Sequence, residues 1–211
     1  MAHIVITIGR EFGSGGKEIS LKLAERLNVR CYDNELLAAA AQESGLCEEV
    51  IKESDEKPTR GFFHALSTNS YHMSNYSMTT FSELPLNHKV FLAQFDAIRA
   101  IAQKESCVIV GRCADYALAD NPYCMSVFVH AEMDFRLSRV RKDIDMDDVK
   151  LKDYIIKADK KRANYYNYYS GKKWADSRSY DLCLDSSKIG IDKSVDLIIE
   201  YARTRFPELS I

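Results

Sequence analysis

Four glycines lie close together near the start of the chain, and their spacing suggests a chemical role. They stand at positions 9, 13, 15 and 16, and Lys17 follows directly. Glycine allows positive φ and lets backbone N–H groups come close to an anion. The N-terminus of a following helix attracts the same anion, and a lysine adds a mobile positive charge. The segment therefore predicts a phosphate-binding turn.

The turn departs from the strict phosphate-loop pattern GxxxxGK[ST]. Six residues separate Gly9 from Gly16, and Glu18 stands where a hydroxyl should follow Lys17. In such enzymes the lysine contacts the β and γ phosphates and the next hydroxyl ligates magnesium. Either Lys17 reaches around to the phosphates or catalysis is impaired. Hydroxyls near the metal come from Ser14 and Ser20; Ser20 is the predicted magnesium ligand, although spacing does not choose between them.

A dinucleotide site is a second interpretation of the same glycines, three of which fit the pattern GxxxGxG. Asp33 would then bind a ribose, and Tyr168 and Lys172 have the YxxxK spacing of short-chain dehydrogenases. These enzymes also need a catalytic serine upstream of the tyrosine, where positions 155 and 156 are both isoleucine, and an NNAG-like segment, which the chain lacks. An NAD(P)-dependent dehydrogenase is thus kept only as a further alternative.

The elements that must position these residues alternate along the chain. Short β-branched runs predict strands over residues 4–8, 30–32, 107–110, 125–129 and 182–184. Apolar periodicity predicts helices over residues 17–27 and 147–167, and a last helix from Asp192 that stops at Pro207. This alternation predicts an α/β fold with three layers around about five parallel strands.

Composition excludes several classes of protein. The 211 residues fit one domain, and a net charge of −2 does not suggest a partner that is a nucleic acid polymer or an anionic membrane. No apolar run approaches the length of a membrane span or resembles a signal peptide. The six cysteines lack CxxC spacing and the five histidines lack metal-ligand spacing. We therefore expect buried thiols, no zinc, and a cytoplasmic protein.

Several segments together resemble the cytidylate kinase-like family of P-loop nucleoside monophosphate kinases over nearly the whole chain. These segments are GSGGKE at 13–18, CVIVGRCADY at 107–116, SVFVHAEMDFRLSRV at 126–140, ADKKRANYY at 158–166, and YDLCLDSSKIGIDKSVDLIIEYAR at 180–203. The resemblance implies a three-layer α/β/α P-loop NTPase fold in a single domain, 1–211, with a helical insert at 34–104 that binds the nucleoside monophosphate and a lid at 141–178.

The activity implied by this resemblance is magnesium-dependent transfer of the γ-phosphoryl group of ATP to CMP or dCMP. Small-molecule nucleotides are then the partners, and the oligomeric state stays open. Two other functions also stay open: a P-loop kinase of another small acceptor, and a nucleotide-binding module without turnover.

On the ATP side, the resemblance implies binding by the residues of the turn: Gly13, Ser14, Gly15, Gly16, Lys17 and Glu18. By helix register counted back from Leu27, Gly16 occupies the slot of the family's lysine, and Lys17 comes one residue later. Lys17 is a predicted catalytic cation, together with Lys161 and Arg162. A set of further arginines, at 136, 139 and 141, is a candidate source of lid cations.

On the acceptor side, the resemblance implies that Arg112 grips the acceptor phosphate with its planar guanidinium. A purely structural pairing of Arg112 with Asp115 is the alternative. The other predicted acceptor ligands are Asp33, Arg99 and Asp115, and Asp33 serves equally well as a helix cap. Cys113 replaces the family's aspartate after Gly-Arg, which leaves the acceptor base open.

Overall fold

The computed structural model describes residues 3–33 and 86–209, so the polar segment 56–84 and most of the predicted insert lie outside the described residues. Five strands form one parallel sheet in the order β2-β3-β1-β4-β5. They are β1 (Val5–Arg10), β2 (Arg30–Tyr32), β3 (Cys107–Val110), β4 (Cys124–His130) and β5 (Leu182–Asp185). The predicted parallel sheet of five strands is confirmed.

Strand β1 lies at the centre of the sheet, where Ile8 is in register with Val110 of β3 and with Val127 of β4. Its side chains alternate between the two faces, as the period of a strand requires. Ile6 and Ile8 belong to one core cluster, and Val5 belongs to another on the opposite face. Apolar residues on both faces explain why the strand reads as a continuous hydrophobic run.

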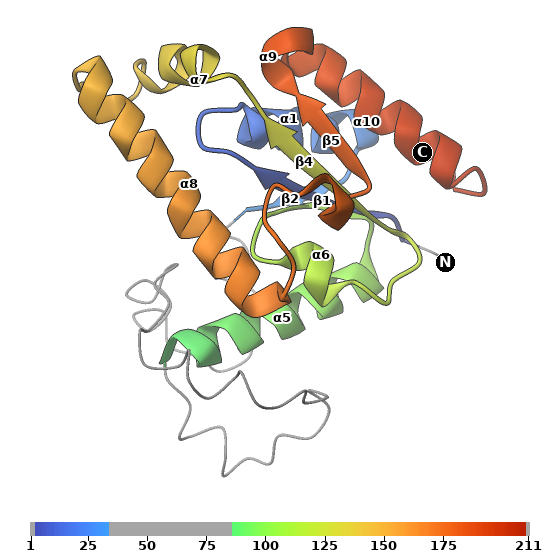
Figure 1. Cartoon of the computed structure of the whole chain (residues 1–211). Helices are drawn as coiled ribbons and strands as arrows, with labels where there is room; N and C mark the ends of the chain where they lie inside the picture. The colour runs from blue at the N-terminus through green and yellow to red at the C-terminus, as the bar shows by residue number, and fades with distance from the viewer. Residues whose placement is uncertain (1–2, 34–85, 210–211) are drawn as a thin grey trace.

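Helices cover both faces and complete the three layers (Figure 1). On one face, α1 (Gly16–Leu27) and α10 (Ile191–Arg205) pack through Leu23 and Ile198 against the Ile6 and Ile8 side of the sheet. On the other face, α5 (Leu86–Lys104) and α6 (Ala114–Ala117) pack around Val5 and Ile109. The predicted three-layer α/β architecture is confirmed.

Helix α1 shows how the sequence sets the start and end of an element. Its apolar stripe, Ile19 and Leu23, is fully buried, and the helix ends at Asn28, which adopts the left-handed conformation with φ 52°. Ion pairs from Lys22 to Asp192 and from Arg26 to Asp196 join its exposed side to α10. These pairs are exposed and contribute little stability, so the buried stripe is the main attachment.

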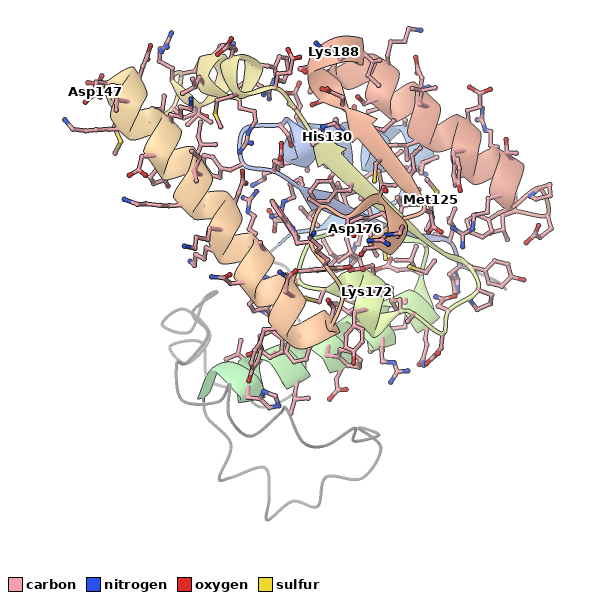
Figure 2. The ribbon with its side chains drawn as sticks, in the orientation of Figure 1. Met125, His130, Asp147, Lys172, Asp176 and Lys188 are labelled. Carbon is pink, nitrogen blue, oxygen red and sulfur yellow. The ribbon has the colours of Figure 1, made fainter. Side chains whose placement is uncertain are left out.

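The long helix α8 (Asp148–Ser170) follows α7 (Met133–Val140), and Figure 2 labels Asp147 and Lys172 near its two ends. Asp147 caps the helix by accepting a hydrogen bond from the Lys150 N–H at 3.0 Å, and Gly171 ends it at φ 66°. The short helices η1 (Ser177–Ser179) and α9 (Ser186–Ile189) flank β5. The predicted lid range, 141–178, contains α8 and ends within η1.

Only three side chains of α8 are buried. Leu151 and Ile155 pack with Val140 and Phe12, whereas Tyr166 packs with Phe91 of α5. The helix therefore contacts the glycine turn near its start and α5 near its end (Figure 1). Within residues 3–33 and 86–209, no helix combines the length and apolar character needed to cross a bilayer.

Candidate functional site

The glycine turn connects the end of β1 at Arg10 to the start of α1 at Gly16. Gly13 and Gly15 adopt φ of 79° and 82°, in the left-handed region that disfavours other residues. The Ser14 hydroxyl donates to the Glu11 carbonyl at 2.9 Å, and the Ser14 carbonyl accepts from the Ser186 hydroxyl at 2.5 Å. The turn is therefore held in shape from both sides.

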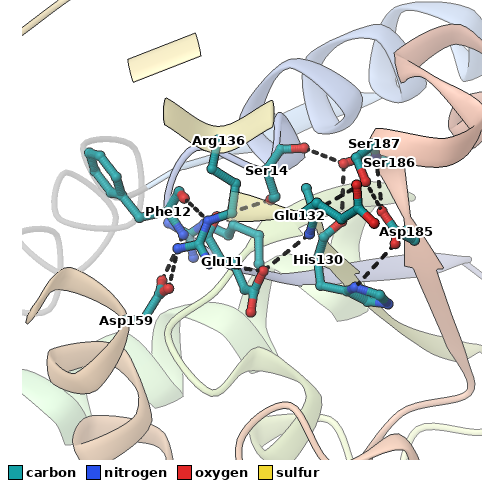
Figure 3. Close-up of polar contacts among 12 residues, drawn as sticks. Glu11, Phe12, Ser14, His130, Glu132, Arg136, Asp159, Asp185, Ser186 and Ser187 are labelled. Carbon is teal, nitrogen blue, oxygen red and sulfur yellow. Dashed lines mark hydrogen bonds and ion pairs between the residues drawn. The ribbon is translucent and has the colours of Figure 1, made fainter. Parts of the chain in front are cut away.

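A buried ion network fixes this turn to α7 and α8 and to the segment that joins β4 to α7 (Figure 3). The Arg136 side chain of α7, 5% exposed, donates from Nε to the Phe12 carbonyl at 2.7 Å and pairs with Glu11 at 3.2 Å and with Asp159 of α8. Asp159 also accepts from the Phe12 N–H at 2.7 Å, and Glu11 accepts from the Ala131 N–H at 3.1 Å. Arg136 was considered above as a lid cation. In the structure its guanidinium instead anchors the turn.

The predicted residues at the start of α1 point in different directions. Lys17 is 68% exposed, and its Nζ lies 3.3 Å from the Asp33 carboxylate. Glu18 pairs with Arg139 at 2.7 Å, and this hydrogen bond lowers the pKa of the Glu18 carboxyl. Ser20 is buried and donates its hydroxyl to the Gly16 carbonyl at 2.7 Å. The structure therefore turns the predicted magnesium ligand, Ser20, away from solvent.

A cavity of about 40 Å³ lies at the carboxyl ends of β1 and β3, beside α8. Helix α1 follows β1 on one face of the sheet and α6 follows β3 on the other, and ligands of open α/β sheets bind at such switch points. Three arginines line the cavity: Arg10 from β1, Arg112 after β3 and Arg162 from α8. The Arg162 Nη1 donates to the Arg10 carbonyl at 3.1 Å.

Asp115 brings a carboxylate to the same cavity. It accepts a hydrogen bond from the Tyr166 hydroxyl at 2.7 Å, and the Lys172 ammonium lies 3.8 Å away. Burial raises the pKa of Asp115, while the Tyr166 hydrogen bond and the Lys172 charge oppose this rise. Because the residues that line the cavity include three arginines and one carboxylate, the cavity favours an anionic ligand.

Aromatic side chains form another wall of the cavity. Tyr166 stacks on Tyr180 with ring centroids 5.9 Å apart, and Trp174 meets Phe128 edge to face at 5.1 Å. The buried Tyr180 hydroxyl lacks a hydrogen-bond partner within the described part of the chain. It is therefore a polar group for a ligand to satisfy. Tyr169 does not line the cavity, because it stacks on Phe91 at 3.9 Å.

Of the predicted acceptor ligands, Arg112 and Asp115 meet at this cavity, but two others lie elsewhere. The Arg99 guanidinium lies 3.8 Å from Asp120 and 5.4 Å from the centre of the Phe95 ring. It lines a separate hollow with His3 and Tyr123. Asp33 pairs with Lys17 as described above, and its structural alternative, a helix cap, would fall on residues outside the described ranges.

The two predicted catalytic residues of α8 are neighbours, but only one lines the cavity. Arg162 is a lining residue, whereas Lys161 is exposed. Sequence reasoning missed Arg10, Trp174 and Tyr180. The position of Arg10 directly after Gly9 was a usable signal, but nothing in the charged, aromatic tract from 171 to 180 singled out Trp174 or Tyr180.

The donors present fit a polyphosphate anion, since left-handed glycines, a helix N-terminus and three guanidinium groups all favour negative charge. Among the described residues, no three His, Cys, Asp or Glu side chains gather as a metal site. Magnesium bound with a nucleotide takes most ligands from phosphate and water, so such a cluster is not required. The described cysteines, 31, 107, 113, 124 and 183, are free thiols.

Comparison with known proteins agrees with this geometry. The model of the cytidylate kinase-like family matches residues 5–188. A crystal structure of an uncharacterized protein from Eubacterium ventriosum ATCC 27560 is 33% identical, with TM-score 0.70, and the match covers 95% of this chain and 98% of that one. None of the curated proteins matches the chain.

Two shikimate kinases share the fold at lower identity. The enzyme from Bacteroides thetaiotaomicron is 18% identical, with TM-score 0.51 and coverage of 94% of this chain and 97% of that chain. The enzyme from Acinetobacter baumannii, in complex with shikimate, is 9% identical, with TM-score 0.51 and coverage of 96% and 94%. The fold is that of the P-loop kinases.

Proposed function

The chain belongs to the cytidylate kinase-like family, and on this basis we propose that it transfers the γ-phosphoryl group of ATP to a nucleoside monophosphate, CMP or dCMP. The observation that carries the proposal is the cavity where Arg10, Arg112 and Arg162 converge beside the glycine turn. Phosphoryl transfer needs two anionic groups held in line and cations where negative charge spreads, and little covalent chemistry from the protein.

The roles follow from position. Backbone N–H groups of the turn, between Gly13 and Gly16, hold the ATP phosphates at the start of α1. Arg112 grips the acceptor phosphate, and Arg162 of α8 neutralises the group in transit. Asp115 orients the acceptor through its hydrogen-bonded carboxyl group.

The remaining predicted residues surround this centre. Glu18 and Ser14 shape the turn, and Lys17 and Lys161 are exposed cations that do not line the cavity. Bound magnesium supplies Lewis-acid neutralisation of the phosphate oxygens. Glu18 lies in the first turn of α1, where it pairs with Arg139 at 2.7 Å.

The size of the cavity implies movement. A volume of about 40 Å³ accommodates only a few water molecules, so a nucleotide needs these walls to separate. Helix α8 carries Arg162 and has only three buried side chains, so it has fewer buried contacts to rearrange than the core strands. We therefore propose that residues 141–178 act as a lid.

Acceptor-dependent release of ADP tests the proposal. The full chain is supplied with ATP and magnesium and with CMP, dCMP, UMP, AMP, GMP or shikimate in turn. Fastest release with CMP or dCMP supports the proposal. Release with shikimate alone would assign another small acceptor, and ATP binding without release for any compound would favour the nucleotide-binding module.

A further inference from the structure

We propose that the Arg10 guanidinium contacts the γ-phosphoryl group of bound ATP and takes the role that a lysine has in other phosphate-loop enzymes. This inference rests on the proposed function. It names a catalytic residue that the glycine pattern does not reveal. It also answers the difficulty raised by the sequence, because the chain has glycine, Gly16, in the slot of that lysine.

The stem of Arg10 fills the space that the missing lysine would need. A Cβ atom built on Gly16 would lie 2.5 Å from the Arg10 Cβ and 3.0 Å from its Cγ. Real Cβ atoms do not approach other carbon atoms so closely, so a side chain at 16 and the present Arg10 side chain exclude one another. A lysine at 16 and the Arg10 side chain in its present position therefore cannot be accommodated together in this turn.

The far end of the Arg10 side chain reaches the acceptor side of the cavity. A Cβ atom built on Gly111 would overlap the Arg10 Nη1 and lie 3.2 Å from its Cζ. Gly111 has φ 74° and directly precedes Arg112. The Arg10 guanidinium therefore lies between the glycine turn, which holds ATP, and Arg112, which holds the acceptor. The transferred phosphoryl group must pass through that interval.

Lys17, the other candidate for this role, is directed elsewhere. Its ammonium pairs with Asp33 at 3.3 Å and is 68% exposed, and Lys17 does not line the cavity. Asp33 follows β2, an outer strand of the sheet, whereas Arg10 ends the central strand β1. Reaching the cavity would require Lys17 to leave Asp33, while Arg10 is already there.

The chemistry of arginine suits the task. Its guanidinium stays charged at all relevant pH values and offers parallel N–H donors that match two phosphate oxygens. The Arg162 Nη1 donates to the Arg10 carbonyl at 3.1 Å, so closure of α8 around the substrates brings a second guanidinium to the same phosphoryl group. Both charges act where negative charge accumulates in the transition state.

The test compares R10Q with K17Q in the full chain. Calorimetry measures the affinities for ADP and for a non-hydrolysable ATP analogue, and ADP release measures turnover with the best acceptor. We expect R10Q to lose about 10²- to 10³-fold in kcat/KM, the usual effect of removing a transition-state charge contact. The preference of R10Q for the ATP analogue over ADP should also fall towards one, because only ATP carries the γ-phosphate. K17Q should lose less than about tenfold in kcat/KM, since an exposed cation contributes little.

Two further variants, R10K and R26Q, serve as controls. R10K keeps the charge and should recover part of the turnover, which separates a charge effect from a folding defect. R26Q removes an exposed arginine of α1 that pairs with Asp196 and should behave as wild type.

A large loss of turnover in K17Q, with R10Q near wild type, would overturn the inference and would assign the contact with the γ-phosphoryl group to Lys17. An unchanged ATP-to-ADP preference in a folded R10Q would also overturn it. Failure of the wild type to bind ATP would instead overturn the proposed function.

Discussion

Gly13 and Gly171 adopt similar left-handed conformations, with φ of 79° and 66°, but in different surroundings. A Cβ atom on Gly13 would lie 2.8 Å from the Val140 Cγ2 and 3.1 Å from the Arg136 carbonyl oxygen. A Cβ atom on Gly171 would meet nothing within 4 Å. The two glycines therefore separate the effect of backbone strain from the effect of close approach at the turn.

We expect Gly171→Ala to lower the free energy of unfolding by about 1–2 kcal/mol, the penalty of the left-handed conformation alone. Gly13→Ala should lower it further and should also weaken ATP binding, because the turn must shift to relieve the overlap with Val140. Urea unfolding and calorimetry with an ATP analogue measure both quantities. Equal losses of stability and affinity in the two variants would show that the turn adapts freely.

Arg112 also has positive φ, 58°, and its guanidinium lies over the Tyr165 ring at 5.9 Å from the centroid. A non-glycine residue in this conformation carries strain, and such strain at a cavity is consistent with a functional role for Arg112. Arg112→Ala should raise the acceptor KM by at least about tenfold, since a charge-assisted bidentate contact is lost, while ATP affinity is kept. Steady-state kinetics with varied acceptor decide this, and unchanged kinetics would remove Arg112 from the site.

At the scale of elements, the important contact is that between the turn, α7 and α8. The buried Arg136 side chain holds these segments together through Glu11, Asp159 and the Phe12 carbonyl. Phe12 also meets Tyr154 of α8 edge to face, with centroids 5.5 Å apart. The phosphate-binding turn and the proposed lid are thus one connected unit, although Phe12 and Asp159 are 147 residues apart in sequence.

We expect Arg136→Met to lower the free energy of unfolding by about 3–5 kcal/mol, because it leaves two carboxylates without their buried partner. Arg141→Met, which removes an arginine 54% exposed beside Asp148, should lower it by less than about 1 kcal/mol. Urea unfolding compares the two. Adding Asp159→Asn to Arg136→Met should recover part of the loss; if the double variant is less stable still, the uncompensated charge is not the cause.

At the scale of the whole molecule, the site lies at the carboxyl ends of β1 and β3, whose following helices cover opposite faces of the sheet. Helices α1 and α10 cover one face and α5 and α6 cover the other, so the carboxyl ends of β1 and β3 open between them. The core strands are buried on both sides, whereas α8 has mostly exposed residues. Ligand binding should therefore change the mobility of α8 far more than that of the sheet.

Hydrogen exchange tests this difference. With an ATP analogue and the acceptor present, amides of residues 148–170 should become more protected, because Asp159 and Arg162 connect α8 to the turn. Amides of α10, which contacts the core through Ile198 and Ala202, should change little. Protection confined to residues 9–18, with α8 unaffected, would contradict the proposal that α8 belongs to a lid.

Much of the fold was predictable because its signals are local. Strands 30–32 and 107–110 were predicted with the bounds that the structure has, and the bounds of the other three strands differ by one or two residues at one or both ends. β-branched runs and apolar helical stripes depend only on neighbouring residues. The predicted helix over 147–167 likewise corresponds to α8, which begins after its Asp147 cap and ends before Gly171.

The candidate site was predictable only in part. The glycine turn and Arg112 belong to short sequence motifs that can be recognised locally, and both border the cavity. Arg99 was expected there and lies beside Asp120 instead, because its direction depends on how α5 packs. Arg136 and Arg139 are two of several similar arginines in one segment, and sequence offers no way to tell which of them becomes buried.

The sequence by itself determined the order of strands and helices and the phosphate-binding character of the turn, since each follows from residues within one or two turns of chain. Only the tertiary structure decided which cations share a cavity. In sequence, Arg112 follows Arg10 by 102 residues and Arg162 follows Arg112 by 50. The three converge because parallel strands end at the same edge of the sheet and α8 lies beside that edge. Such convergence depends on packing between distant segments, which no local pattern encodes.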